Sequence, residues 1–156
     1  MSTILVIDDA ALARETISRL LQHEGFETLT ARNGKEAWAS LYHRVPDLIL
    51  LDLMMPEMDG VTFLSMLRRD ARWGHLPVVV LTAADDRDRL ISRAWDLGVD
   101  DLIPKHDFGF DELVARVRHH LDAAQAEAGA ARRAPSRAVA NRTASWRPMT
   151  PQAASA

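Results

Sequence analysis

Residues 48–60 read Leu-Ile-Leu-Leu-Asp-Leu-Met-Met-Pro-Glu-Met-Asp-Gly, an apolar run that ends on a carboxylate. The four apolar residues of 48–51 predict a buried strand, yet Asp52 follows at once, where turn residues would be expected. Burying a lone carboxylate costs several kcal/mol unless the charge is paired or bound to a cation. The stretch therefore predicts a carboxylate with a function at the end of a buried strand.

Strand-like and helical patterns alternate along the chain up to residue 122. Strand-like runs, three of them nearly all apolar, predict strands at Ile4–Ile7, Glu27–Ala31, Leu48–Leu51, Val78–Leu81 and Asp101–Ile103. Apolar residues three or four positions apart predict a helix after each strand. Nearly continuous apolar strands are typical of parallel sheets that are covered on both faces. We therefore expect an α/β fold with a doubly wound, five-stranded parallel sheet.

The composition is that of an ordinary soluble domain, with 156 residues of which 47% are apolar and 26% charged. The absence of cysteine excludes a disulfide framework and thiolate chemistry, and it fits a reducing compartment. We find no signal peptide and no apolar run long enough to span a membrane. We therefore expect a cytoplasmic protein with no membrane partner.

The last part of the chain differs from the rest in charge and composition. Residues 123–156 carry five arginines and one acid, for a net charge of +4, which leaves −7 on residues 1–122 out of a total of −3. Helix propensity could carry the last helix to about Gly129, but prolines at 135, 148 and 151 exclude a continuous helix beyond. We expect a folded domain over residues 1–124 and a tail or linker over residues 125–156, flexible from about residue 130, with no direct binding of nucleic acid.

Polar residues follow four of the predicted strands: Asp8, Asp9, Asp52, Thr82 and Lys105. Taken singly, each has a plain structural explanation, such as a helix cap for the aspartates or a surface position for the lysine. In open parallel sheets, however, ligand sites form at the carboxyl ends of the strands. Three carboxylates that meet there need a neutralising cation. Oxygen ligands suit Mg²⁺, and a hydroxyl and an ammonium suit phosphate.

The motifs that carry a family resemblance are Ile7-Asp8-Asp9, Leu51–Gly60, Leu81–Ala84 and Gly98–Leu102, with Lys105 beyond. Through them the chain resembles the receiver (CheY-like) domain of two-component response regulators. The resemblance covers residues 3–122. It implies a flavodoxin-like sheet with strand order 2-1-3-4-5. It also implies a switch domain that catalyses its own phosphorylation and dephosphorylation, rather than an enzyme with a free substrate.

The resemblance implies a role for each residue of the set. Asp52 would accept a phosphoryl group from a phosphohistidine of a sensor histidine kinase or a phosphotransfer protein. Asp9, Asp52 and the backbone carbonyl of Met54 would bind Mg²⁺, and Asp8 would act through water. Lys105 and Thr82 would bind oxygens of the acyl phosphate.

Two positions depart from the family pattern. Leu102 stands at the switch position, where the family usually has Tyr or Phe, and His106 replaces a proline that commonly follows a cis bond. Because a cis bond before a non-proline residue costs about 2.5–4 kcal/mol, the Lys105–His106 bond is expected to be trans or strained. The segment His106–Phe110 looks one residue longer than usual, and His106 itself is either an exposed loop histidine or a pH sensor.

A receiver without an output domain would act by docking, on a partner or on a second copy. The helix of Leu90–Leu97 leaves two apolar residues off its core face, and they could join others in a patch: Ile91, Trp95, Leu102 and Val114. Asp101 and Arg116 resemble an ion pair between the copies of a homodimer in the winged-helix class of regulators. Ile91 stands where that class has a basic residue that takes part in the dimer contacts, so the set is incomplete. Trp95 could lie flat on its own domain instead of forming part of an interface.

Three other functions remain to be weighed. A pseudo-receiver would use its surface without phosphorylation, and Leu102 and His106 leave this alternative open. An aspartyl-phosphate phosphatase would place a second aspartate two residues after the nucleophile, where this chain has Met54. A flavin-binding protein would need a Gly-rich loop that binds phosphate. The residues after the first strand, Asp8-Asp9-Ala10-Ala11, do not form such a loop.

Overall fold

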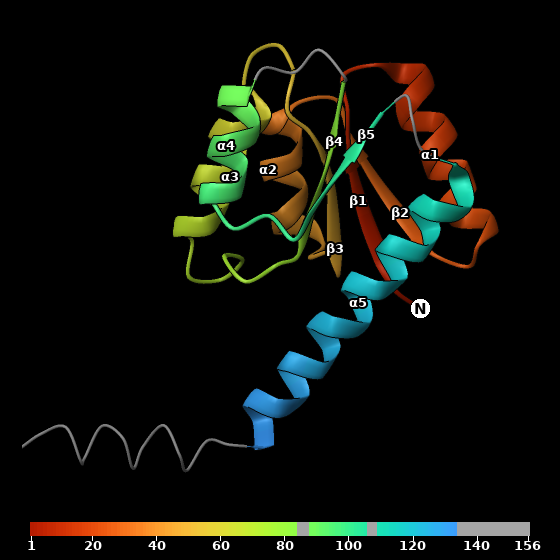
Figure 1. Cartoon of the computed structure of the whole chain (residues 1–156), viewed down its shortest axis with the longest axis vertical. Helices are drawn as coiled ribbons and strands as arrows, with labels where there is room; N and C mark the ends of the chain where they lie inside the picture. Colours follow the sequence, from red (N-terminus) through yellow and green to blue (C-terminus); the bar gives the residue numbers. More distant parts are fainter. Residues whose placement is uncertain (84–87, 106–108, 134–156) are drawn as a thin grey trace, which may run out of the picture. The chain divides into compact units, whose positions relative to one another are not determined.

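One parallel sheet organises the chain. The structure is a computed structural model, and it describes residues 1–83, 88–105 and 109–133. Five strands lie in the order β2-β1-β3-β4-β5 (Figure 1). They are β1 (Thr3–Ile7), β2 (Glu27–Ala31), β3 (Leu48–Asp52), β4 (Val78–Thr82) and β5 (Asp101–Pro104). The expected fold class and strand order are therefore confirmed.

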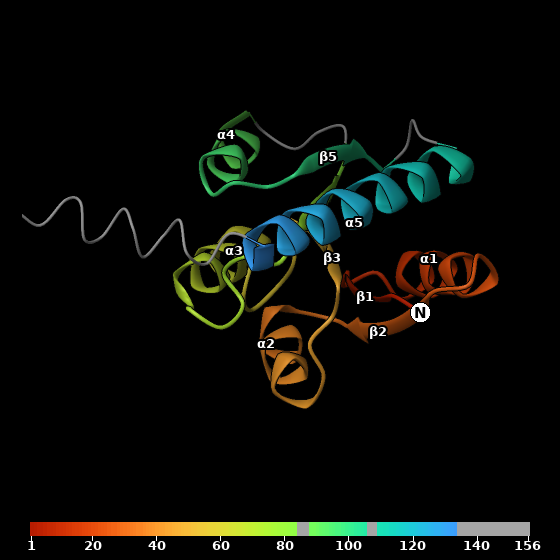
Figure 2. The same cartoon turned by 90° about the horizontal axis from the view of Figure 1, so that it is seen from below.

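Helices cover both faces of the sheet. They are α1 (Ala11–His23), α2 (Gly34–His43), α3 (Gly60–Arg69), α4 (Asp88–Asp96) and α5 (Phe110–Arg133). α1 and the first part of α5 pack on one face, and α2, α3 and α4 pack on the other, as the view along the sheet shows (Figure 2). The domain is thus a three-layer sandwich.

The central strands supply a core to each face. Every residue of β1, β3 and β4 is buried. Because successive side chains of a strand point to opposite faces, Leu5 and Ile7 pack towards α2 and α3, whereas Ile4 and Val6 pack towards α1 and α5. This double burial explains why the strands read as continuous apolar runs.

The element boundaries refine the sequence prediction in two places. β3 and β4 each extend one residue further than predicted and end on Asp52 and Thr82, so both polar residues belong to the sheet. The last helix was expected to end near Gly129, but α5 continues to Arg133, two residues before Pro135. Ala130 and Ala131 favour the helix, which explains the extension into the segment expected to be flexible.

The chain divides into two units, Met1–Asp122 and Ala123–Ala156, of which the second is described up to Arg133. The predictions for the Lys105–His106 bond, the His106 loop and the tail beyond residue 133 fall outside the described residues. No helix in the described part of the chain is long and apolar enough to cross a membrane.

Candidate phosphoryl-acceptor site

The register of the sheet brings the predicted polar residues to one edge. Ile7 pairs with Leu51, and Asp52 pairs with Leu81, so the residues after β1 and at the ends of β3 and β4 are neighbours. Thr82 pairs with Pro104, which places Lys105 directly beyond β5 at the same edge. The convergence thus follows from strand order and register.

Asp8, Asp52 and Lys105 form a buried cluster of charges. The side chains of Asp8 and Asp52 are 1% and 4% exposed, and that of Lys105 is 19% exposed. The Lys105 Nζ atom lies 2.8 Å from Asp8 Oδ2 and 3.2 Å from Asp52 Oδ2. One ammonium therefore neutralises part of the charge of two carboxylates that would otherwise repel each other.

Burial changes the protonation of this cluster. Loss of hydration raises the pKa of Asp52 to about 7, and the charge of Asp8 adds to this rise, while the Lys105 ammonium opposes it. Burial by itself lowers the pKa of Lys105, but the negative charges of Asp8 and Asp52 outweigh burial and hold this pKa above its ordinary value. Lys105 therefore remains a cation, and Asp52 is poised between its acid and its carboxylate near neutral pH.

The three aspartates fit a divalent cation. One oxygen atom from each of Asp8, Asp9 and Asp52 lies within 4.8 Å of the others. Asp8 Oδ2 is buried and receives no well-aligned hydrogen bond from the described residues, although Lys105 is close. Such an oxygen has spare capacity for a metal, and an all-oxygen set suits Mg²⁺.

The local backbone shows that the two aspartates do not cap α1. The residue that precedes the helix is Ala10, and its side chain makes no capping hydrogen bond. Asp8 Oδ1 instead accepts a 2.9 Å hydrogen bond from the Ala10 N–H, and Asp9 is exposed. The plain explanation of Asp8-Asp9 as helix caps is therefore not supported.

The segment after β3 turns sharply back against the strand. Asp59 caps α3 by accepting a 2.7 Å hydrogen bond from the Thr62 N–H. Gly60 packs directly on the strand end, since a Cβ there would lie 2.4 Å from the Asp52 carbonyl oxygen. Glu57 adopts a φ of 67°, a conformation that non-glycine residues rarely adopt. The Met54 N–H donates to Asp52 Oδ1 at 3.1 Å, so this turn also fixes one oxygen of the acceptor.

Comparison with known proteins identifies the family of the chain. Residues 4–118 match the family model of the response regulator receiver domain. The chain belongs to this family. Two similar curated proteins are the phosphate regulon transcriptional regulatory protein PhoB of Pseudomonas aeruginosa and the response regulator Rre1 of Synechocystis.

The match to PhoB has 41% identity over 116 residues, 74% of this chain and 50% of PhoB. The match to Rre1 has 41% identity over 130 residues, 82% of this chain and 55% of Rre1. The receiver chain therefore spans about half the length of the curated relatives it matches.

Solved receiver structures share the fold. The receiver domain of a signal transduction histidine kinase from Syntrophus aciditrophicus is 32% identical, with a TM-score of 0.72 over 79% of this chain and 92% of that one. The chemotaxis protein CheY4 of Vibrio cholerae is 25% identical, with a TM-score of 0.70 over 77% of this chain and 98% of that one. The chain is thus a CheY-like receiver.

The remaining acyl-phosphate ligand predicted for this receiver is Thr82, which is 3% exposed. Its hydroxyl donates to the Ala83 carbonyl at 3.3 Å, and its own carbonyl accepts from the Lys105 N–H at 2.6 Å. The Thr82 hydroxyl thus lies at the same edge as Asp52. Its role towards a phosphoryl group stays a prediction, as does that of the Met54 carbonyl towards a metal.

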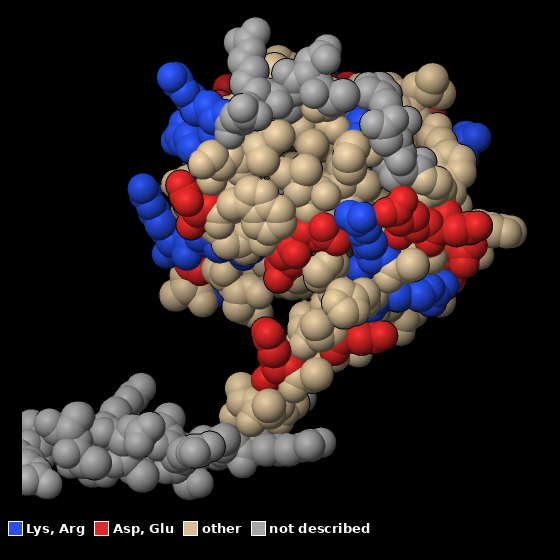
Figure 3. Space-filling view, viewed as in Figure 1, with Lys and Arg blue, Asp and Glu red and all other residues tan. Residues whose placement is uncertain are grey.

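The predicted interface residues of the receiver divide into exposed and buried ones. Trp95 is 50% exposed on α4, and Ile91 and Leu102 are half-buried. Val114 corrects the expectation of a surface patch, because it is 8% exposed and packs with Leu113 and Val117 in the core stripe of α5. Over α4 and β5 the surface has an area without charged side chains, beside acidic and basic groups along α5 (Figure 3).

Several functional candidates were missed in the sequence. Leu12 is 80% exposed and Phe110 52%, and both follow strands at the edge that carries Asp52. The side chain of Met54, of which only the backbone carbonyl was predicted to act, is 55% exposed at the same edge. His120 of α5 contacts Asp101, which single-residue patterns do not signal. The exposed apolar residues could have been found by noting that Leu12 and Phe110 stand in the first turns of α1 and α5.

Proposed function

We propose that this receiver takes a phosphoryl group onto Asp52 from a phosphohistidine of a histidine kinase or a phosphotransfer protein. The observation that carries the proposal is the buried Asp52 carboxylate with Lys105 at 3.2 Å and two further aspartates beside it. A structural ion pair would need neither the third carboxylate nor the position at the carboxyl edge of the sheet. The pseudo-receiver alternative is not favoured, and the cluster of Lys105 with three aspartates supports the acceptor proposal.

The proposed transfer balances as a simple displacement. An oxygen of Asp52 forms a bond to phosphorus, the phosphorus–nitrogen bond breaks, and the imidazole nitrogen keeps the electron pair. Lys105 and Thr82 would bind the phosphoryl oxygens, and the Met54 N–H holds Asp52 Oδ1. Asp8, Asp9 and Asp52 would hold Mg²⁺, which when bound supplies positive charge that stabilises the phosphoryl oxygens.

The surface around the site suits a partner with apolar side chains. Leu12 and Phe110 begin α1 and α5, which lie on the same face of the sheet, and Met54 follows β3. Exposed apolar residues grouped around a polar centre are typical of protein interfaces. We propose that the phosphodonor protein docks on these exposed apolar residues. We also propose that the phosphoryl transfer takes place in the cytoplasm.

The output of the receiver would pass through the face formed by α4, β5 and α5. Trp95 and Ile91 supply apolar contact area there, and Asp101 and Arg116 supply charge. Because this face combines exposed apolar area with charged side chains, we propose that it binds a protein partner, with a homodimer as one form of the complex.

The experiment that tests the acceptor incubates the protein with Mg²⁺ and acetyl phosphate and reads intact mass and site by mass spectrometry. Wild type should gain one phosphoryl group, and Asp52→Asn should gain none. Asp96→Asn, at an exposed position on α4, is the matched control and should behave as wild type. An equal adduct on wild type and Asp52→Asn would contradict the proposal.

A further inference from the structure

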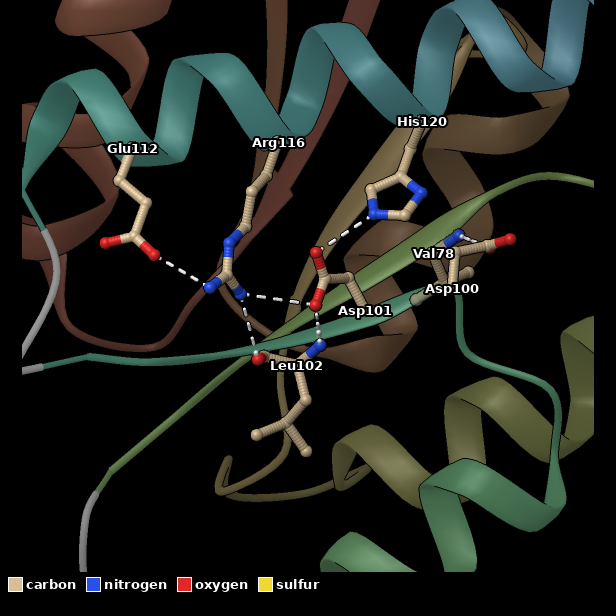
Figure 4. A network of polar contacts seen from close by, with 7 residues as sticks. All are labelled: Val78, Asp100, Asp101, Leu102, Glu112, Arg116 and His120. Atoms are coloured by element: carbon tan, nitrogen blue, oxygen red, sulfur yellow. Dashed lines mark hydrogen bonds and ion pairs between the residues drawn. The ribbon is translucent and has the colours of Figure 1, made fainter.

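The carboxylate of Asp101 in β5 is bound by two side chains of α5 (Figure 4). Asp101 Oδ2 lies 2.9 Å from Nε2 of His120, and Asp101 Oδ1 lies 3.3 Å from Nη1 of Arg116. Oδ1 also accepts a 2.8 Å hydrogen bond from the Leu102 N–H. Both oxygens of Asp101 are therefore engaged within the chain.

Arg116 is in turn held by two further groups. Its Nη2 lies 2.7 Å from Glu112 Oε1, and its Nη1 lies 3.5 Å from the Leu102 carbonyl oxygen. Glu112, Arg116 and His120 recur every four residues, so they form one stripe along α5. The stripe and Asp101 together fix the backbone of Leu102, the switch position of this receiver, at both its N–H and its carbonyl.

We propose that Asp101, Arg116 and His120 form an intrachain clamp that opposes the association of this receiver with a second copy of itself. The inference rests on the proposed output through the α4–β5–α5 face. Asp101 and Arg116 carry opposite charges on that face, so a two-fold arrangement would set each against its counterpart in the other copy. The same two side chains can serve the clamp or the interface, but a carboxylate that is engaged at both oxygens within its own chain is less available to another.

His120 gives the Asp101 carboxylate a second contact from α5. The side chains of His120 and Asp101 are 15% and 23% exposed, so their contact is shielded more than an ordinary surface pair. Histidine is the side chain that ordinarily gains its charge between pH 5 and 8. Because a hydrogen bond between two charged groups is stronger than a neutral one, the clamp would hold Asp101 more firmly with a charged imidazole than with a neutral one.

The other ionisable groups around His120 do not replace this contact. Arg116 lies one turn earlier on α5 and binds the other oxygen of Asp101. The ring of His119 lies 5.0 Å from that of His120, and His119 is exposed. Asp100 accepts a 2.8 Å hydrogen bond from the Val78 N–H and lies 3.9 Å from Arg68. Arg116 and His120 are therefore the two side chains of α5 that contact the Asp101 carboxylate.

The first test is analytical ultracentrifugation of the full chain at pH 6 and pH 8, with and without Mg²⁺ and beryllofluoride. Wild type should associate more weakly at pH 6 than at pH 8. His120→Gln should lower the dissociation constant at pH 6 about tenfold, the effect of losing one charge-assisted hydrogen bond, and should remove most of the pH dependence. His119→Gln is the matched control and should follow wild type.

Equal association of wild type and His120→Gln at both pH values would overturn the proposal, and so would the absence of association under every condition. A second measurement addresses the clamp without a dimer. In urea unfolding, the effects of His120→Gln and Asp101→Asn should be coupled, and more so at pH 6. Additive effects would overturn the clamp. The coupling should persist in Asp52→Asn, which separates this result from a failure of the phosphorylation proposal.

Discussion

Lys105 Nζ lies 3.2 Å from Asp52 Oδ2, so the residue after β5 supplies the counter-charge for the residue that ends β3. In the metal-free protein this ammonium is the cation that the buried carboxylates share, and in the phosphorylated form it would bind a phosphoryl oxygen. The same contact thus serves the resting protein and the proposed chemistry.

Replacing Lys105 should therefore slow phosphorylation. Loss of one positioned charge donor typically costs a hundredfold or more in rate, so we expect Lys105→Met to react with acetyl phosphate about 100-fold more slowly than wild type. Lys105→Arg should retain part of the rate, because it keeps the charge but not the geometry. Time courses of intact mass measure both rates. A phosphorylation rate for Lys105→Met within about twofold of the wild-type rate would refute this role.

Binding of Mg²⁺ should depend on pH through Asp52. The pKa of this buried carboxyl is raised to about 7, and a proton there competes with the metal. As pH increases towards 7, we expect the affinity for Mg²⁺ to increase about tenfold per pH unit, and above about pH 8 it should level off. Isothermal titration calorimetry measures the affinity. Asp52→Asn should bind more weakly and without this dependence, and an unchanged slope in that variant would show that another group titrates.

The stability of the metal-free protein should fall as pH rises from about 4 to about 7. Over this range folded Asp52 still holds a proton that the unfolded chain has released, because the folded pKa is the higher one. The loss is at most about 1.4 kcal/mol for each pH unit. Urea unfolding in the presence of a chelator should show Asp52→Asn to be more stable than wild type at pH 8, with the difference shrinking towards pH 5. If the free energies of unfolding of the two proteins changed with pH in parallel, the raised pKa of Asp52 would be contradicted.

Arg68 should be essential to stability. Its guanidinium donates to four backbone carbonyls, those of Gly74, Leu76, Leu97 and Gly98, at 2.7–3.0 Å. We expect Arg68→Met to lower the free energy of unfolding by about 3 kcal/mol, since three partly buried carbonyls and one exposed carbonyl lose a charged donor. Arg69→Met changes the same residue type at the next, exposed position and should cost little. Equal urea midpoints for the two variants would contradict this role.

Gly60 should tolerate no side chain. A Cβ there would lie 2.4 Å from the Asp52 carbonyl oxygen and 2.7 Å from the Leu53 Cα, both backbone atoms. We expect Gly60→Ala to lose about 2 kcal/mol or more of stability by overpacking and to phosphorylate poorly. Gly109→Ala, where a Cβ meets nothing within 4 Å, is the control and should be near neutral. Thermal unfolding and phosphorylation assays compare the two.

Sequence patterns predicted those parts of the molecule that depend on local periodicity and on strand ends. The buried runs fixed the five strands, and the polar residues after them identified Asp52 and its neighbours. Patterns could not predict contacts that depend on how one element packs on another. His120 meets Asp101 because of the angle at which α5 crosses β5, and Val114 enters the core because the buried stripe of α5 is wider than the apolar spacing suggested.

The bonds of Arg68 also define how α4 can move. They fasten the carboxyl end of this helix, at Leu97 and Gly98, to α3 and the segment before β4. A displacement of α4 that preserves these bonds would leave Leu97 and Gly98 in place and would move the start of the helix, at Asp88, more than its end. The start of α4 follows β4, which ends at the edge of the sheet that carries Asp52, so such a displacement would be largest on that side of the domain.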